Sequence, residues 1–87
     1  MATVWIPAPL RDLTNGQQTV TAPGATVRQV IEALDAAYPG LRERLCDGNV
    51  LRPGIAVAVG TQVAPLGLAQ PLGPESEVHF LPAIGGG

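Results

Sequence analysis

The side chains of this sequence that could do chemistry by themselves are few and scattered. His79 is the only histidine, and it stands between two apolar residues, Val78 and Phe80. This alternation predicts a strand in which those two residues face the core and His79 faces solvent, rather than acting as a base or a metal ligand. Glu75 and Glu77 fall at a turn, where carboxylates are usually solvated and a paired acid/base role is uncommon. We therefore predict no catalytic residue here.

Cys46 is the single cysteine of the chain. One cysteine excludes an internal disulfide, a cysteine-held zinc site and a cysteine-ligated iron–sulfur cluster. Its position beside Leu45 favours packing in the core over a reactive thiol. No spacing of Asp and His in the sequence indicates a metal site either, so we expect the chain to bind no cofactor of its own.

The remaining chemical group is the carboxylate that ends the stretch "LPAIGGG". Three extended glycines would project this carboxylate roughly 10 Å beyond Ile84, at about 3.3–3.6 Å per residue. Gly85, Gly86 and Gly87 have no side chains, so they form a narrow rod that fits a slot in another protein. They are not a phosphate-binding loop, because no helix follows them.

A carboxylate becomes a useful electrophile once it is activated, which in biology commonly means adenylation with ATP. A sulfur nucleophile can then leave a thiocarboxylate on Gly87, whereas a cysteine or an amine would give a thioester or a conjugate. Each step is catalysed by a partner enzyme, which also uses the ATP. The sequence therefore predicts a protein that is not itself an enzyme.

The length, hydrophobic content and charge of the chain exclude several classes of protein. The chain has 87 residues, enough for one domain, and 46% of them are hydrophobic, which excludes a disordered chain. Five Arg stand against seven Asp and Glu with no basic cluster, so nucleic acid is not an expected partner. No apolar run approaches the roughly 20 residues of a membrane span, and the first residues do not resemble a signal peptide. We expect a cytoplasmic protein.

The first half of the chain predicts a hairpin followed by a helix. "TVWIPAPL" (3–10) reads as a strand whose proline-containing second half is frayed, and "QTVTA" (18–22) as its partner across an Asn15-Gly16 turn. In "TVRQVIEALDAAYPG" (26–40), apolar residues recur at helical spacing. Thr26 and Gln29 fit a capping box, and Pro39-Gly40 ends the helix.

The second half predicts a short helix at 41–45, a turn at "CDGN", and a strand within "GIAVAVG" (54–60) that is covered on both faces. A turn-rich passage (61–76) follows, from which Leu68 and Leu72 point inward, and "EVHFL" (77–81) is the last strand. This order favours an α+β roll, a mixed sheet with one main helix packed on it, and the β-grasp or ubiquitin-like architecture fits best. Residues 1–82 form the domain, and 83–87 a flexible glycine tail.

Three stretches resemble one family, the ubiquitin-like sulfur carriers represented by MoaD, ThiS and CysO. They are "AAYPGLRERL" (36–45), "LRPGIAVAVG" (51–60) and "GLAQPLGPESEVHFLPAIGGG" (67–87), so the resemblance covers most of the chain. It implies the β-grasp fold and assigns Gly86 and Gly87 to the family's diglycine, with Gly87 as the thiocarboxylate site. "VGTQ" departs from the Asn-Gly turn of relatives. The ending looks closest to CysO.

The resemblance also implies partners. The activator would be a MoeB- or ThiF-like adenylating enzyme, and the sulfur acceptor a cysteine synthase or another thiolating enzyme. In the family, partners dock on an apolar face of the sheet, which suggests Leu66, Leu68 and Leu81 here; ordinary core packing is the alternative for each.

Two other functions remain open from the sequence. The chain could be the small, MoaD-like subunit of molybdopterin synthase, with its tail in the active site of the large subunit. It could also be a ubiquitin-like modifier conjugated to lysines of other proteins. The chain itself contains no lysine, which prevents lysine-linked chains of this protein on itself.

Overall fold

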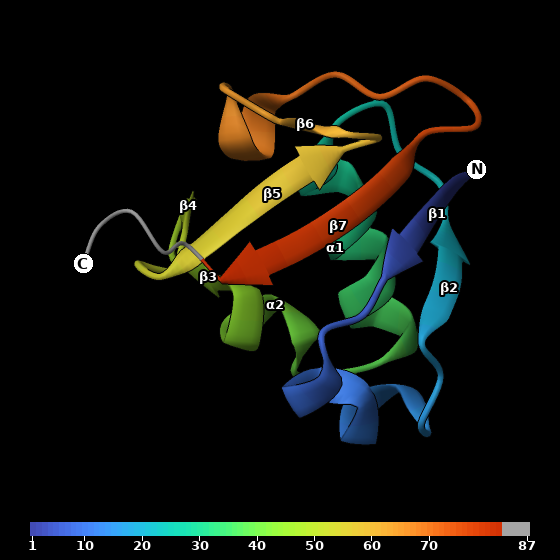
Figure 1. The fold of residues 1–87 in the computed structure, drawn as a ribbon. Helices are drawn as coiled ribbons and strands as arrows, with labels where there is room; N and C mark the ends of the chain where they lie inside the picture. The colour runs from blue at the N-terminus through green and yellow to red at the C-terminus, as the bar shows by residue number, and fades with distance from the viewer. Residues whose placement is uncertain (83–87) are drawn as a thin grey trace.

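The computed structural model describes residues 1–82, and its centre is a mixed five-stranded sheet in the spatial order β2-β1-β7-β5-β6. The sheet strands are β1 (Ala2–Trp5), β2 (Thr19–Ala22), β5 (Ile55–Val59), β6 (Gln62–Val63) and β7 (Glu77–Pro82). The other elements are the helices α1 (Val27–Ala37) and α2 (Leu41–Leu45), the 3-10 helices η1 (Ala8–Thr14) and η2 (Gly67–Ala69), and the hairpin strands β3 (Cys46–Asp47) and β4 (Val50–Leu51). Helix α1 lies across one face of the sheet, and the other face carries no helix (Figure 1).

The predicted N-terminal hairpin is confirmed, because β1 and β2 pair antiparallel with Val4 opposite Val20. Its connection differs from the prediction. The expected frayed half-strand is instead the 3-10 helix η1, which begins directly after Pro7. Pro7 caps η1 in extended backbone, with ψ of 145°, and Pro9 lies in the first turn of η1, where the fixed φ of proline suits a helix and its missing N–H leaves no helical hydrogen bond unmade. Asn15 and Gly16 then turn the chain at positive φ.

Helix α1 begins and ends as the sequence predicts. The Thr26 hydroxyl oxygen accepts a hydrogen bond from the Gln29 backbone N–H at 3.3 Å. The Gln29 side-chain oxygen accepts from the Ala25 N–H at 2.7 Å, one residue before the helix cap. These two bonds satisfy backbone donors that a helix start leaves free. The apolar stripe of α1 is fully buried against the sheet; it consists of Val27, Val30, Ile31 and Leu34.

Strand β7 is the central strand of the sheet. It runs parallel to β1, with Val4 opposite Val78, and antiparallel to β5, with Val57 opposite Phe80. Val78 and Phe80 are buried, which confirms the predicted inward face of this strand. Pairing with β1 ends at His79, whereas pairing with β5 continues to Pro82. The last residues of β7 therefore have a neighbouring strand on one side only, where proline's missing N–H is tolerated.

Two predictions for the middle of the chain are confirmed only in part. The predicted turn at "CDGN" is present at Gly48 and Asn49, but it closes a small hairpin, β3–β4, in which Cys46 pairs with Leu51 and which the sequence did not predict.

The apolar run of β5 predicted a strand covered on both faces, and this holds for its middle only: Val57 and Ala58, which point to opposite faces, are buried, whereas Ile55, Ala56 and Val59 are partly buried. Ala58 is covered although no helix lies on its face, because it is a small residue between His79 of β7 and Val63 of β6.

The core lies between the sheet and the helices and includes Cys46, as predicted for a packing cysteine. Among residues 1–82, no helix is long and apolar enough to cross a membrane. Over the same residues, no three His, Cys, Asp or Glu side chains gather as a metal site would require.

Candidate functional site

The chain leaves the sheet from its central strand. β7 ends at Pro82, opposite Ile55 of β5, at the same end of the molecule as the β3–β4 hairpin (Figure 1). The predicted tail residues Gly85, Gly86 and Gly87 lie outside the described part of the chain. Because β7 is hydrogen-bonded within the sheet, the point from which residues 83–87 start is fixed by the fold.

The open face of the sheet presents apolar side chains beside this exit. Trp5 of β1 and Leu81 of β7 are 40% and 42% exposed. The indole of Trp5 stacks on the His79 imidazole, with ring centroids 5.3 Å apart and planes inclined by 12°. Val63 of β6 is also exposed on this side of the sheet, next to Ala58. Exposed apolar groups gathered in this way mark surfaces that contact other proteins.

His79 and the two glutamates do not form an acid/base site. The nearest approach is 3.8 Å between His79 Nε2 and Glu77 Oε1, on the open sheet face where both side chains contact solvent. Glu75 is exposed in the preceding turn. His79 lies on the outward face as predicted, but Trp5 covers one side of its ring, which the sequence did not reveal.

The three leucines suggested for docking do not share one surface. Leu81 lies on the open sheet face, whereas Leu68 is only 6% exposed and belongs to the core. Leu66 is 58% exposed but lines a different hollow, together with Val50 and Arg28. Leu68 therefore has the packing role that the alternative interpretation gave it.

Trp5 is the residue of this surface that the sequence interpretation missed. The signal was present: Ala2, Val4 and Ile6 alternate on the buried face, so the residue between Val4 and Ile6 must point outward. An outward tryptophan on a strand is uncommon enough to indicate an interface, since aromatic residues are enriched there.

Cys46 is unsuited to carry an acyl group or sulfur itself. Burial raises the pKa of its thiol, and the nearby positive charges of Arg42, Arg28 and Arg52 only partly oppose this effect. The thiolate is the nucleophilic form, so a buried thiol with a raised pKa reacts slowly.

The comparisons with known proteins agree with this geometry. The ThiS family model matches residues 4–87, nearly the whole chain. The chain belongs to the ThiS family. The sulfur carrier protein CysO of Mycobacterium tuberculosis is 38% identical over 92 residues, covering 98% of this chain and 97% of the relative.

Solved structures of relatives show the same fold. The crystal structure of Mycobacterium tuberculosis CysO superposes on this ThiS-family chain with a TM-score of 0.87 at 36% identity, covering 97% of this chain and all of the other. A chain of the Amycolatopsis orientalis BexX/CysO complex gives 0.89 at 32% identity, with both chains fully covered. SAMP1 of Haloferax volcanii gives 0.77 at 27%, covering 99% and 98%. The predicted β-grasp fold and the resemblance to CysO-type sulfur carriers are confirmed.

Proposed function

We propose that this ThiS-family protein carries sulfur as a thiocarboxylate on Gly87. The observation that supports this most is the family match, which continues through Gly87, together with 38% identity to CysO over nearly the full length. The carboxylate oxygen attacks the α-phosphate of ATP and pyrophosphate leaves. The sulfur of hydrogen sulfide then attacks the acyl carbon, AMP leaves with the acyl oxygen that it holds, a proton is lost from sulfur, and Gly87 ends in a thiocarboxylate.

In this proposal the domain presents its C-terminal tail to partner enzymes, and those enzymes catalyse the reactions. Glu75, Glu77 and His79 line one open hollow, but His79 and Glu77 approach no closer than 3.8 Å and both contact solvent, and the cysteine is buried. A MoeB- or ThiF-like adenylating enzyme binds ATP and performs the activation. A cysteine synthase or another thiolating enzyme then takes the sulfur. The sheet holds β7 so that the tail enters both enzymes from a fixed starting point.

The decisive experiment is the intact mass of the protein after incubation with a MoeB-like adenylating enzyme, ATP and sulfide. The expected product has one oxygen exchanged for sulfur, and fragmentation places the change on Gly87. A variant with one alanine added after Gly87 is the control, and it should remain unmodified with unchanged thermal stability. A thiocarboxylate that forms equally well on this blocked variant contradicts the proposal.

A second function, conjugation to other proteins, is favoured by the similarity to SAMP1 of Haloferax volcanii, which is described as a small archaeal modifier protein. In that case a lysine amine, instead of sulfide, attacks the activated Gly87 carbonyl and forms an amide. Proteolysis of cell extract would leave a glycine remnant on target lysines. If no such remnant depends on Gly87, conjugation is not a role of this protein.

A further inference from the structure

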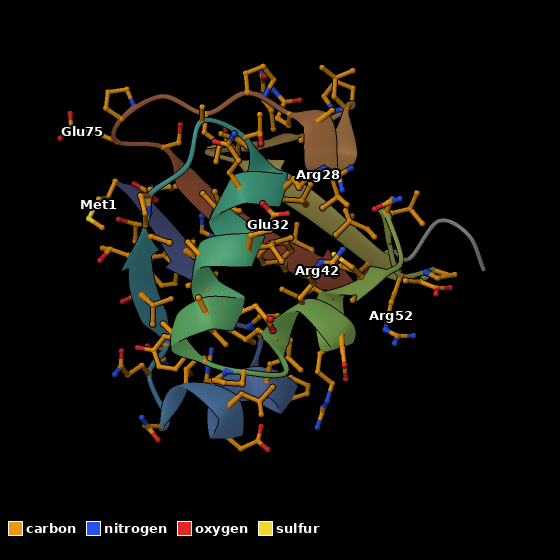
Figure 2. The ribbon with its side chains drawn as sticks, turned by 180° about the vertical axis from the view of Figure 1, so that it is seen from behind. Met1, Arg28, Glu32, Arg42, Arg52 and Glu75 are labelled. Atoms are coloured by element: carbon orange, nitrogen blue, oxygen red, sulfur yellow. The ribbon has the colours of Figure 1, made fainter. Side chains whose placement is uncertain are left out.

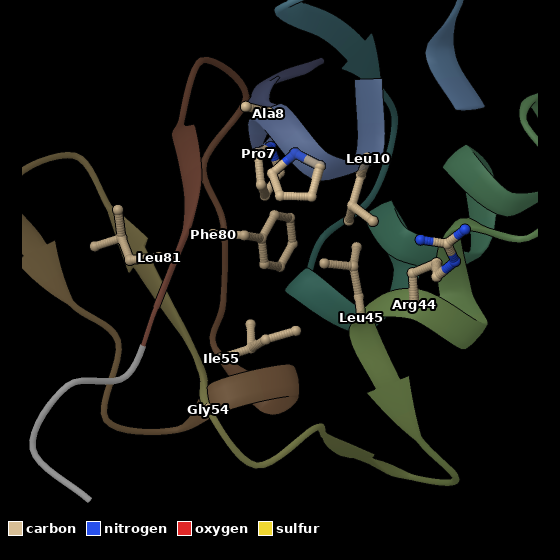
Figure 3. A pocket seen from close by; sticks show the side chains of 10 residues that line it. Pro7, Ala8, Leu10, Arg44, Leu45, Gly54, Ile55, Phe80 and Leu81 are labelled. Atoms are coloured by element: carbon tan, nitrogen blue, oxygen red, sulfur yellow. The ribbon is translucent and has the colours of Figure 1, made fainter. Parts of the chain in front are cut away.

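A hollow of about 450 Å³ opens beside the end of β7, and its lining is almost entirely apolar. Figure 3 shows Pro7 and Leu10 above the Phe80 ring, Leu45 and Arg44 to its right and Ile55 below it, with Leu81 apart on the left. The complete lining is Pro7, Ala8, Pro9, Leu10, Arg44, Leu45, Gly54, Ile55, Phe80 and Leu81. We call this hollow the exit pocket.

The exit pocket exists because β1 is shorter than β7 at the end where β7 leads into the tail. Pairing between these strands stops at Trp5 and His79, and the chain then bends at Pro7 into η1. β7 continues beside β5 as far as Pro82. The space that a longer β1 would fill therefore stays open, with Phe80 at its base. The pocket is a consequence of the strand lengths and not of one flexible side chain.

The rim of the exit pocket is positively charged. Arg44 is exposed and makes no ion pair with any acidic residue of the described chain. Arg42 and Arg52 (Figure 2) do not line the pocket, and their guanidinium groups are held by the backbone, because Arg42 donates to the Gly48 carbonyl and Arg52 to the Glu43 carbonyl. Arg44 is thus the arginine available at the pocket for a carboxylate from outside.

We propose that the exit pocket receives an apolar side chain of the adenylating enzyme, flanked by an acidic residue that pairs with Arg44. The inference rests on the proposed function and names the contact that anchors the activator beside the tail. The exit pocket shares Leu81 with the open sheet face, and the rest of its lining comes from η1, α2 and the ends of β5 and β7.

The short length of the chain after Pro82 supports the adenylating enzyme as the occupant of the exit pocket. The five residues after Pro82 span at most about 18 Å when fully extended, so an enzyme that binds Gly87 in its active site must cover the surface around the exit. The exit pocket borders that surface through Leu81 and Ile55. An apolar side chain that is fully desolvated in a pocket is typical of an interface hot spot. The ion pair with Arg44 would fix the orientation of the enzyme on the carrier.

The test measures KM and kcat for the carrier in pyrophosphate release by a MoeB-like adenylating enzyme. Ala8→Trp fills the pocket from an exposed position, and Arg44→Glu reverses the charge at its rim. The matched controls are Ala36→Trp on the exposed side of α1 and Arg42→Glu on the same short helix as Arg44. Neither control residue lines the pocket. Thermal melts of the four variants verify that each one folds.

We expect both pocket variants to raise KM about tenfold, the equivalent of about 1.4 kcal/mol, with kcat nearly unchanged. The controls should stay within about twofold of the wild type. KM values of Ala8→Trp and Arg44→Glu that match those of the controls overturn the inference, even though sulfur transfer itself proceeds. If the wild-type chain is never adenylated, the proposed function fails instead, so the two failures are distinguishable.

A second measurement tests a competing occupant, the chain's own Ile84. Methyl NMR of the free protein would show contacts between Ile84 and Leu10 if the tail filled the pocket. Such contacts overturn the proposal, because the pocket would then serve the tail. Their absence, together with new contacts to Leu10 when the enzyme binds, supports it.

Discussion

The side chains of Trp5 and His79 stack on each other from directly opposite positions on the parallel strands β1 and β7, with ring centroids 5.3 Å apart. The register extends this pair into a row across the open sheet face, since His79 lies opposite Ala58 and Ala58 opposite Val63. A stacked indole is worth about 0.5–1.5 kcal/mol beyond its buried area, so Trp5 has a fixed orientation rather than a free one. The open face therefore presents a preformed apolar surface that costs little entropy to bind.

Trp5 is the only tryptophan of the chain and can report on docking to this face. With 5-fluorotryptophan in the carrier alone, we expect adding the adenylating enzyme to shift and broaden the fluorine resonance. Val63→Glu places a charge on this surface without touching the exit pocket and should weaken the interaction about tenfold. Ala36→Glu, at an exposed position on helix α1, which covers the other face of the sheet, is the control. An unchanged resonance at saturating enzyme would mean that partners bind elsewhere.

Leu66 and Leu68 are close in sequence but opposite in environment. Leu68→Ala removes a core side chain, and we expect a loss of about 2–4 kcal/mol in the free energy of unfolding. Leu66→Ala changes an exposed side chain and should stay within about 0.5 kcal/mol of the wild type. Urea denaturation of the two variants gives both values. Equal losses would place both leucines in the core and contradict the structure.

The sequence predicted the elements whose signals are local. Helix α1 has a complete apolar stripe, a capping pair at Thr26 and Gln29, and a Pro-Gly stop, so the prediction and the structure agree closely. The short hairpin β3–β4 and helix η1 carry no such pattern, because each depends on contacts with distant parts of the chain. One example is the bond from Arg28 of α1 to the Asn49 carbonyl in the hairpin turn.

The candidate site was harder to predict because exposure is decided by tertiary structure. Leu66 and Leu68 stand in the same Pro- and Gly-rich passage, and only the fold separates the buried leucine from the exposed one. The exit pocket arises from the unequal lengths of β1 and β7, which no sequence pattern encodes. The family assignment, in contrast, rested on motifs at 36–87 that are local and could be recognised directly.

Burial of Cys46 leads to a pH dependence of stability. An unfolded thiol ionises near its ordinary pKa of about 8.5, whereas burial raises the pKa of the folded one. Above about pH 8.5 the unfolded state binds fewer protons than the folded state, so stability falls as pH rises toward the folded pKa. Urea denaturation at pH 7.5 and 10 should show a larger loss for the wild type than for Cys46→Ala. Equal losses would indicate that Cys46 ionises freely in the folded protein.

The three tail glycines are expected to differ in importance. If the resemblance to the sulfur carriers holds in the tail, Gly86 and Gly87 are the diglycine that enters the partner enzyme and Gly85 precedes it. A methyl group at 86 or 87 widens the rod beside the reacting carbonyl, and small misplacements near the chemistry can cost about 100-fold in rate. We expect Gly86→Ala and Gly87→Ala to reduce thiocarboxylate formation by about this factor, and Gly85→Ala by less than about threefold. Rates come from intact mass at timed intervals, and thermal melts should be the same for all three variants. A Gly85→Ala variant as slow as the others would mean that the partner slot encloses all three glycines.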